Sequence, residues 1–339
     1  NRISCSPKPE HSNQVRFSVM QLVVSSKPRI DRSILSPSSR MRQLPPPFDV
    51  SPTYYFPFGV NAIYHGLRAL GVSPGDTILV PSFHCASVVE SIISYGANVK
   101  FFNIRRDLSP DFRDIEAKID SKVRAVLAIH YFGFPQPIQR LMELCRAHHL
   151  YLIEDCAHVL TGEVNGTTLG TVADISIFSW RKLLPLFDGG QLVINNPKLH
   201  IDIPWQGHYR PLSLAKIYRK IIVDLIDGSP VKKIKGLPRL LLLPYSIGRR
   251  LFPERKRPTQ GFDLSLVDLR MSRLSKYILR NADIPAIYKK RRRNSIFLIK
   301  ALESMPEITP LFPDLQKGIC PWLLPVLIDG GQYFRERLR

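Results

Sequence analysis

The chain has 339 residues, of which 44% are hydrophobic and 22% charged, and its formal net charge at pH 7 is +20. This length allows roughly two domains with a buried core, and the composition is ordinary for a globular protein. The five cysteines are scattered and form no CxxC pair. This pattern argues against a disulfide framework or a zinc site and favours a reducing compartment, so we expect a cytoplasmic protein. No apolar run approaches the roughly 20 residues that a transmembrane helix needs.

The first 45 residues differ in composition from the rest of the chain. They are rich in Ser, Pro and Lys/Arg, and Glu10 together with the long polar lead argues against a signal peptide. We therefore predict a flexible leader over residues 1–45. The segment PPPFDVSP, residues 45–52, then leads into the first folded domain, which we place at residues 46–200.

From Tyr54 the sequence predicts regular elements. Gly59 begins a turn that enters an amphipathic helix, in which apolar residues recur at helical spacing from Ala62 to Leu70. Free backbone N–H groups at such a helix start favour a phosphate, although most turns of this kind are only helix entries. A strand at residues 77–80, a helix at 86–95 and a strand at 99–103 follow. Another strand up to residue 130 and a helix at 137–148 continue this alternation, which is typical of a parallel, doubly wound sheet.

The stretch from Tyr151 to Asn195 combines three short apolar runs with polar residues at their ends. YLIE, DISIFS and QLVI are typical of strands buried on both faces. Asp155 ends the first run; Ser179, Arg181 and Lys182 end the second, and DGG at residues 188–190 predicts a tight turn. Because ligands bind outside the carboxyl ends of parallel strands, these side chains are candidates for one pocket.

A carboxylate and a lysine 27 positions apart, each at the end of a buried strand, suit pyridoxal phosphate. That cofactor needs a lysine amine for a Schiff base and a carboxylate that keeps its ring nitrogen protonated. The lysine must lose its proton to act as a nucleophile, and a dry, cationic pocket beside Arg181 would favour that loss. The alternative is structural: Asp155 as a cap and Lys182 as a solvated loop residue.

The order of motifs from about Tyr54 to Asn196 resembles the DegT/StrS family of pyridoxal-phosphate-dependent sugar aminotransferases. These proteins have the fold type I aminotransferase architecture. The motifs that carry the resemblance are GVNAIYHGLRALG, GDTILVPSFHCA, HYFGFPQPI, IEDCAHV and FSWRKLLPLFDGG. The resemblance implies an α/β fold with a mostly parallel, doubly wound sheet, flanking helices and a small C-terminal α/β domain.

The resemblance also implies roles for particular residues. Lys182 matches the Schiff-base lysine and Asp155 the partner of the pyridine nitrogen; these are the implied catalytic residues. His158 falls near the position that faces the phenolic oxygen of the cofactor, and Ser179 matches a serine that binds the phosphate. The implied cofactor-binding set is Val60, Asn61, His84, Cys85, Asp155, His158, Ser179 and Lys182.

Two of these assignments stay open. His84 or Cys85 falls at the ring-stacking position, and a hydrogen-bonded structural role for His84 is equally compatible with the sequence. Two features also differ from the family pattern. The serine and lysine are three positions apart where many members have five, and Phe58 lies where a small hydroxyl residue is common at the phosphate turn. A catalytically weakened or inactive homologue that serves as an interaction or membrane-surface protein is therefore the alternative function.

Residues 201–300 carry most of the charge, with 23 Lys and Arg residues against 7 Asp and Glu residues. We predict a basic helical insertion at residues 201–260. Three interpretations are open: a solvated surface, an attraction for anionic substrates such as nucleotide-sugars, or peripheral contact with an acidic membrane. Nucleic-acid binding is disfavoured, because the basic patch lacks elements that read bases.

Residues 261–339 predict two connecting helices, broken near Asp283–Pro285, and the beginning of a small C-terminal domain that we expect to be incomplete. Taken together, the residues and the resemblance predict a pyridoxal-phosphate-dependent aminotransferase. The resemblance implies glutamate as amino donor, a keto-sugar nucleotide as acceptor, and a homodimer; no metal is expected.

Overall fold

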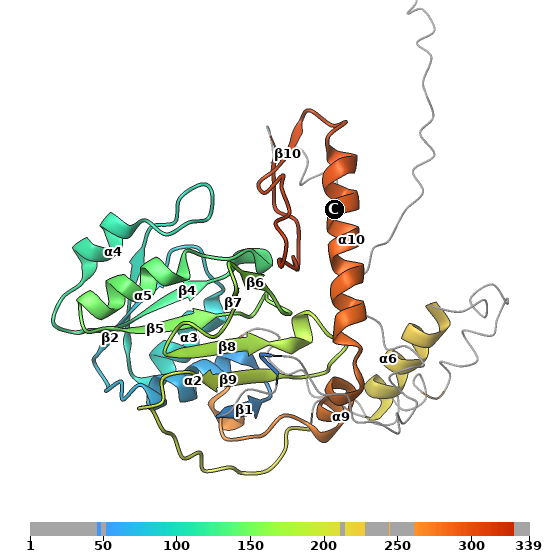
Figure 1. The fold of residues 1–339 in the computed structure, drawn as a ribbon. Coiled ribbons are helices and arrows are strands. Elements are labelled where there is room, and N and C mark those ends of the chain that lie inside the picture. The colour runs from blue at the N-terminus through green and yellow to red at the C-terminus, as the bar shows by residue number, and fades with distance from the viewer. Residues whose placement is uncertain (1–45, 49–51, 211–213, 228–243, 245–260, 329–339) are drawn as a thin grey trace, which may run out of the picture.

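The computed structural model describes residues 46–48, 52–210, 214–227, 244 and 261–328. Its centre is a mixed sheet of seven strands in the order β1-β9-β8-β5-β4-β2-β3 (Figure 1). The strands are β1 (Thr53–Phe56), β2 (Thr77–Pro81), β3 (Asn98–Phe102), β4 (Val123–Ile129), β5 (Tyr151–Asp155), β8 (Ile175–Ser179) and β9 (Gly190–Ile194). Neighbouring pairs from β3 to β8 are parallel, whereas β9 runs antiparallel to both β8 and β1.

Helices cover both faces of this sheet, as expected for a doubly wound α/β fold. They are α2 (Gly59–Ala69), α3 (Ala86–Tyr95), α4 (Phe112–Lys118) and α5 (Ile138–Ala147). One apolar cluster joins α2 and α3 to the sheet, with Leu67 and Ile92 fully buried. A second cluster joins α4 and α5 to the other face through Ile115 and Leu141. Strands β2, β8 and β9 are buried along their whole length, which explains why they contain no charged residues.

The predicted fold class is confirmed, with differences at the edges. The predicted strands and helices begin or end within one or two residues of the observed ones. Edge strand β1, helix α4 and the two-residue strands β6 (Glu163–Val164) and β7 (Thr167–Thr168) were not predicted. Strand β1 is only half-buried along most of its length and pairs with residues more than 130 positions away, so neither periodicity nor local turns indicate it.

The segment after the sheet contains α6 (Leu214–Asp227), α9 (Arg273–Asn281), α10 (Ile284–Leu302) and the paired strands β10 (Ile308–Pro310) and β11 (Val326–Ile328). The predicted break near Asp283–Pro285 is confirmed, because α9 ends before it and the Asp283 carboxylate caps α10 by accepting from the Ala286 N–H at 3.0 Å. In Figure 1, α10 rises away from the sheet.

Some predictions concern residues outside the described ranges. These are the leader at residues 1–45, most of the basic region beyond α6, and residues 329–339. The division into domains stays a prediction. Within the described ranges, no helix is long and apolar enough to cross a membrane.

Candidate active site

The predicted site residues lie where β5 and β8 end at the same edge of the sheet. The two strands are parallel neighbours, and Asp155 pairs with Ile177 in their register. Asp155 is the last residue of β5, and Ser179 is the last residue of β8. The register therefore brings the ends of the IEDCAHV and FSWRK motifs together, as the parallel arrangement predicts.

Lys182 is positioned by the short 3₁₀ turn Trp180–Lys182 that follows β8. Trp180 anchors the turn: its backbone N–H donates to the Gly189 carbonyl at 2.8 Å, and its indole N–H donates to Gln191 Oε1 at 2.8 Å. The Trp180 ring is fully buried and stacks on Phe178. With the turn fixed, the Lys182 side chain places Nζ 3.1 Å from His158 Nε2.

The Asp155 carboxyl is buried but only partly hydrogen-bonded. Its Oδ1 accepts from the Ala157 backbone N–H at 2.9 Å, and no other hydrogen bond joins this carboxyl to another described residue. Burial raises the pKa of Asp155, while the charge of Lys182 and the Ala157 N–H act against this shift. A buried carboxylate with a free acceptor oxygen can receive a hydrogen bond from a bound ligand.

Burial also lowers the pKa of both basic side chains beside Asp155. The pKa of Lys182 is lowered by desolvation; Asp155 and Cys85 oppose the shift, and Arg181 adds to it. The pKa of His158 is lowered to about 3, by burial first and by the Lys182 charge second. The His158 imidazole is therefore neutral at neutral pH. Lys182 loses its proton to give the free amine at a lower pH than a lysine in water does.

The start of α2 lies against Ser179. A Cβ added at Gly59 would lie 3.3 Å from the Phe178 carbonyl oxygen and 3.8 Å from Ser179 Oγ, so the two segments are in contact. By helix geometry, the first N–H groups of α2, including that of Val60, have no intrahelical acceptor. The Ser179 hydroxyl makes no hydrogen bond to another residue within the described ranges. These donors together form a cradle suited to an anion.

Asn61, in contrast, uses its side chain to shape this turn. Its Oδ1 accepts from the Phe58 backbone N–H at 3.2 Å, and the residue is buried. The Phe58 ring packs against Tyr209, and the Arg181 guanidinium lies 5.1 Å from the Phe58 ring centroid. Phe58 thus packs against Tyr209, and the exposed Arg181 side chain lies beside its ring.

The turn at residues 188–190 packs closely against the start of α2. Asp188 is fully buried and accepts from the Ser272 backbone N–H at 2.7 Å and from the Ser275 hydroxyl at 2.5 Å, which ties the turn to the start of α9. Gly189 has a φ of +144°, and the Gly190 backbone lies so close to Phe58 that an added Cβ would overlap the Phe58 carbonyl group. Glycine is therefore required at both positions.

His84 and Cys85 lie at the start of α3 but face different neighbours. The His84 Nδ1–H donates to the Pro81 carbonyl at 3.0 Å, and its ring stacks on Phe101 with a centroid distance of 4.9 Å. Cys85 is exposed and interacts electrostatically with Lys182 and Arg181. The structure therefore brings Cys85, rather than His84, towards the lysine, and the ring-stacking assignment of either residue stays a prediction.

Sequence reasoning missed a buried polar network one residue before Asp155. The Glu154 carboxylate accepts from the His130 ring at 2.8 Å, the Gly170 N–H at 2.6 Å, the Ala173 N–H at 3.4 Å and the Ser176 hydroxyl at 3.5 Å. A charged residue inside the apolar run YLIED was the available signal. His130, Glu154 and Cys156 lie close enough together for a metal ion. However, His130 Nδ1 accepts from the Gln136 N–H at 2.9 Å, so the ring is fully used by protein contacts.

Trp322 was also missed, because it comes from a segment about 140 residues after Lys182. Its ring stacks on His158 at a centroid distance of 4.3 Å and lies 5.4 Å from Lys182 Nζ. Its backbone N–H donates to the Phe132 carbonyl at 2.7 Å. Trp322 therefore covers the lysine and the histidine from the side of the C-terminal segment.

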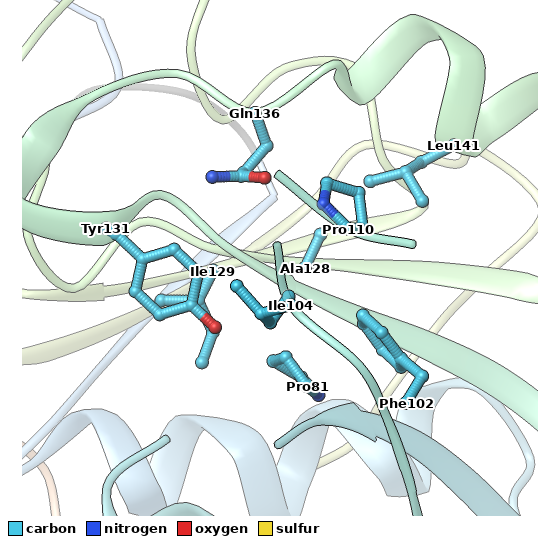
Figure 2. A pocket seen from close by; sticks show the side chains of 9 residues that line it. All are labelled: Pro81, Phe102, Ile104, Pro110, Ala128, Ile129, Tyr131, Gln136 and Leu141. Carbon is cyan, nitrogen blue, oxygen red and sulfur yellow. The ribbon is translucent and has the colours of Figure 1, made fainter. Parts of the chain in front are cut away.

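A small cavity of about 10 Å³ lies beside strands β2, β3 and β4. Figure 2 shows its lining, which includes Pro81, Phe102, Tyr131 and Gln136. Apart from the Gln136 amide and the Tyr131 hydroxyl, which donates to the Phe83 carbonyl at 2.6 Å, its lining is apolar. This space is enough for about one water molecule, and none of the predicted site residues lines it, so it is not the active site.

The order and directions of the strands and the flanking helices match the fold of type I pyridoxal-phosphate aminotransferases. Residues 58–205 match the model of the DegT/DnrJ/EryC1/StrS aminotransferase family, the family that the motif order resembles.

Curated relatives cover the same part of the chain. GDP-perosamine synthase of Vibrio cholerae is 38% identical over 147 residues, which are 42% of this chain and 40% of that protein. The UDP-N-acetyl-3-dehydro-alpha-D-glucosamine 3-aminotransferase of Acidithiobacillus ferrooxidans is 32% identical over 145 residues, 42% of this chain and 39% of that protein. The aligned segment thus spans about two fifths of the length of these relatives.

Solved structures show the same fold over more of the chain. PseC of Helicobacter pylori, an aminotransferase involved in the biosynthesis of pseudoaminic acid, superposes with a TM-score of 0.60 at 17% identity and covers 92% of this chain and 79% of its own. DesV of S. venezuelae gives a TM-score of 0.57 at 21% identity, covering 84% and 67%. At these identities the comparison establishes the fold alone.

The residues present fit pyridoxal phosphate. Within the described part of the chain, three polar groups at one edge of the sheet have unused hydrogen-bonding capacity: the second oxygen of Asp155, the Ser179 hydroxyl and the N–H groups of Gly59 and Val60 at the start of α2. A Cβ at Gly59 would make a tight contact of 3.3 Å with the Phe178 carbonyl oxygen, so the start of α2 packs closely against the end of β8. An acceptor for a ring N–H at the end of β5 and donors for a phosphate at the end of β8 and the start of α2 therefore lie at the same edge of the sheet as the Lys182 turn.

Proposed function

We propose that this protein is a pyridoxal-phosphate-dependent aminotransferase that transfers an amino group to a keto-sugar nucleotide. The observation that carries the proposal is the placement of buried Asp155 at the end of β5 and of half-buried Lys182 in the turn after β8, with an electrostatic influence of each on the pKa of the other. The family match over residues 58–205 supports the reaction class. The names of the curated relatives support a sugar nucleotide as acceptor.

Each residue has a defined task in this proposal. Bound pyridoxal phosphate supplies an electron sink that stabilises negative charge at the carbon that carries the amine. Lys182 would hold the cofactor through its amine, and the same amine would take and return the proton at that carbon. The Asp155 carboxylate accepts the hydrogen bond of the ring nitrogen and keeps that nitrogen protonated. Ser179 and the α2 start, with Val60 and Asn61, hold the phosphate.

The remaining parts of the proposal rest on the same family. Glutamate is the proposed amino donor, and a homodimer in the cytoplasm is the proposed assembly and location. Arg181, exposed beside the phosphate cradle, is available to an anionic substrate such as a nucleotide-sugar. Contact of the basic region with an acidic membrane stays a proposal of the sequence alone.

The test is covalent capture of the cofactor. The purified protein is mixed with pyridoxal phosphate, reduced with borohydride, digested and analysed by mass spectrometry. We expect one reduced pyridoxyl modification, on Lys182, together with an absorbance band that is missing from Lys182→Ala. A chromophore that survives Lys182→Ala, or a wild type without any, would overturn the lysine assignment and favour an inactive homologue.

Turnover is measured separately. Glutamate and GDP- or UDP-linked keto-sugars are supplied to the cofactor-loaded protein, and the formation of 2-oxoglutarate is followed. Capture on Lys182 without turnover on any keto-sugar nucleotide would retain the cofactor chemistry and reject the substrate class.

A further inference from the structure

His158 is held by partners on both ring nitrogens and on a ring face. Its Nδ1 lies 3.2 Å from the Phe132 backbone nitrogen, and its Nε2 lies 3.1 Å from Lys182 Nζ. Trp322 stacks on the imidazole at a centroid distance of 4.3 Å, and the Phe132 ring lies 6.0 Å away and almost parallel to it. The ring therefore has a fixed orientation, and the partner of each ring nitrogen determines whether that nitrogen donates or accepts a hydrogen bond.

The backbone fixes which nitrogen carries the proton. A backbone N–H can only donate, so Nδ1 must accept from Phe132 with its lone pair. Burial among aromatic rings keeps the imidazole neutral at neutral pH. A neutral imidazole carries one proton, and with Nδ1 as acceptor this proton is on Nε2, which faces the lysine.

The protonation state of the lysine follows from that of the histidine. A lysine ammonium has three donors and no lone pair, so it cannot accept from an Nε2–H group. A free amine can. We propose that His158 is a positioning residue that holds Lys182 as an uncharged amine by donating Nε2–H to its lone pair, and that the Phe132 backbone N–H sets the required histidine tautomer.

The Phe132 peptide has an unusual conformation that serves this arrangement. Its φ and ψ are +56° and +12°, in the left-handed region that a phenylalanine rarely adopts. In this conformation its N–H donates to His158 while its carbonyl accepts from Trp322. The next residue, Gly133, is packed so closely that an added Cβ would lie 2.8 Å from the His158 carbonyl oxygen. One strained turn thus both sets the tautomer of His158 and holds Trp322, which stacks on the imidazole.

The titratable groups around Lys182 do not reverse this conclusion. Asp155 from β5 and Cys85 from the start of α3 favour the ammonium, whereas Arg181 in the same turn favours the amine. Burial is the largest influence and also favours the amine. The state of the Lys182 amine does not depend on the proposed function, which only gives that amine its use. An uncharged Nζ can form a C–N bond with an aldehyde carbon at once, and its two protons leave with the carbonyl oxygen as water.

The first test reads the tautomer directly. Protein labelled with ¹⁵N-histidine and free of cofactor is studied by long-range ¹H–¹⁵N correlation, with His158 assigned through His158→Gln. We expect Nδ1 as the unprotonated nitrogen and Nε2 as the protonated one, unchanged from pH 8 to pH 5 and in Lys182→Met. A proton on Nδ1, or a doubly protonated ring in this range, would overturn the proposal.

The second test reads the amine. The rate of reductive methylation of Lys182 by formaldehyde and cyanoborohydride is followed by peptide mass spectrometry from pH 6 to pH 10, with exposed Lys122 as the internal reference. We expect the Lys182 rate to level off at lower pH than the Lys122 rate. His158→Gln, which retains an N–H donor, should keep the Lys182 profile, whereas His158→Leu should move its midpoint up by about one pH unit, as for one lost hydrogen bond.

Superimposable profiles of Lys182 in wild type and His158→Leu would assign the state of the amine to burial alone and reject the role of His158. Both tests are independent of the proposed activity, because neither involves pyridoxal phosphate. If cofactor capture fails but the tautomer is the expected one, the proposed function is rejected and the role of His158 is retained. If capture succeeds but Nδ1 carries the proton, the proposed function is retained and the role of His158 is rejected.

Discussion

Two neighbouring carboxylates on β5, Glu154 and Asp155, are both buried yet have opposite surroundings. Glu154 lies among four donors from the strands and turns around it. Burial, the largest influence, acts to raise its pKa, but the His130 ring and the N–H groups of Gly170 and Ala173 hold the pKa below the ordinary value. Asp155 accepts one backbone hydrogen bond, and burial raises its pKa. Successive residues of a strand point to opposite faces, so the sequence places these two acids in different environments by a single step.

The difference separates a structural acid from an acid that serves a ligand. A buried charge whose oxygens are all used stabilises the fold and has nothing left to bind. A buried carboxylate with one unused oxygen destabilises the protein until a donor arrives, and such groups occur where ligands bind. Burial alone therefore does not identify the functional acid; the number of unused acceptor sites does.

Asp155→Asn should have the largest effect, on activity. An amide cannot keep a pyridine nitrogen protonated, so we expect turnover to fall by about 10³-fold, in the range seen when one electrostatic contact to the developing charge is removed. The stability of the cofactor-free protein at pH 7 should not fall, because a buried, poorly paired charge is removed. Turnover and urea unfolding of the same preparation measure both. A large loss of stability would show that Asp155 is structural.

Glu154→Gln should produce the reverse pattern. The amide nitrogen would face donors such as His130 and the Gly170 N–H, leaving buried donors without acceptors, and we expect a loss of about 3 kcal/mol in the free energy of unfolding. Cofactor capture on Lys182 should persist wherever the variant is folded. The matched neighbour Asp155→Asn is the control, and equal unfolding free energies for the two variants would remove the distinction drawn between the two acids.

Gly190→Ala tests whether the cradle depends on the contact between β9 and the start of α2. The new Cβ would overlap backbone atoms of Phe58, so α2 must shift away from Ser179; we expect a cost of about 2 kcal/mol and weaker binding of pyridoxal phosphate. Gly71→Ala is the control. Gly71 has a positive φ but open space around it, so its cost should be about 1 kcal/mol with unchanged binding. Titration of the cofactor against tryptophan fluorescence compares the two, and equal affinities would argue against the cradle.

The sequence predicted the fold because the central strands are buried on both faces and therefore consist of continuous apolar runs between turns. The same logic placed Asp155, Ser179 and Lys182 at strand ends and in one neighbourhood. Edge strand β1 was beyond prediction because its pattern is half-buried and its partner lies far along the chain. Local spacing indicates which residues end a strand, but not which distant backbone they meet.

The contacts that distinguish Glu154 from Asp155 could not be predicted for the same reason. Gly170 and Ala173 reach Glu154 through backbone N–H groups, which no side-chain pattern encodes. His158 was predicted near the cofactor, yet its partners Phe132 and Trp322 depend on a left-handed turn and on a segment more than 160 residues away. Sequence reasoning finds the groups that carry the chemistry, and the tertiary fold decides which of their atoms remain available.

The smallest expected effect is a divergence of the two acids with pH. Because the folded pKa of Glu154 is lowered, its stabilisation is present above its ordinary value of 4.5 and is lost as the pH falls through the folded pKa. Because the folded pKa of Asp155 is raised, stability is greatest below its ordinary value of 3.8 and is lost as the pH rises through the folded pKa. The two variants should therefore differ from wild type in opposite directions as the pH changes.

Urea unfolding of the cofactor-free protein between pH 3.5 and pH 7 measures this divergence. The deficit of Glu154→Gln should shrink towards low pH, and the advantage of Asp155→Asn should grow towards neutral pH, each by about 1 kcal/mol, the size of one pKa unit. Saturation with pyridoxal phosphate should abolish the advantage of Asp155→Asn, since the ring N–H then supplies the missing donor. Parallel stability curves for the three proteins would mean that the two carboxylates share one environment, and the distinction between a used and an unused acid would fail.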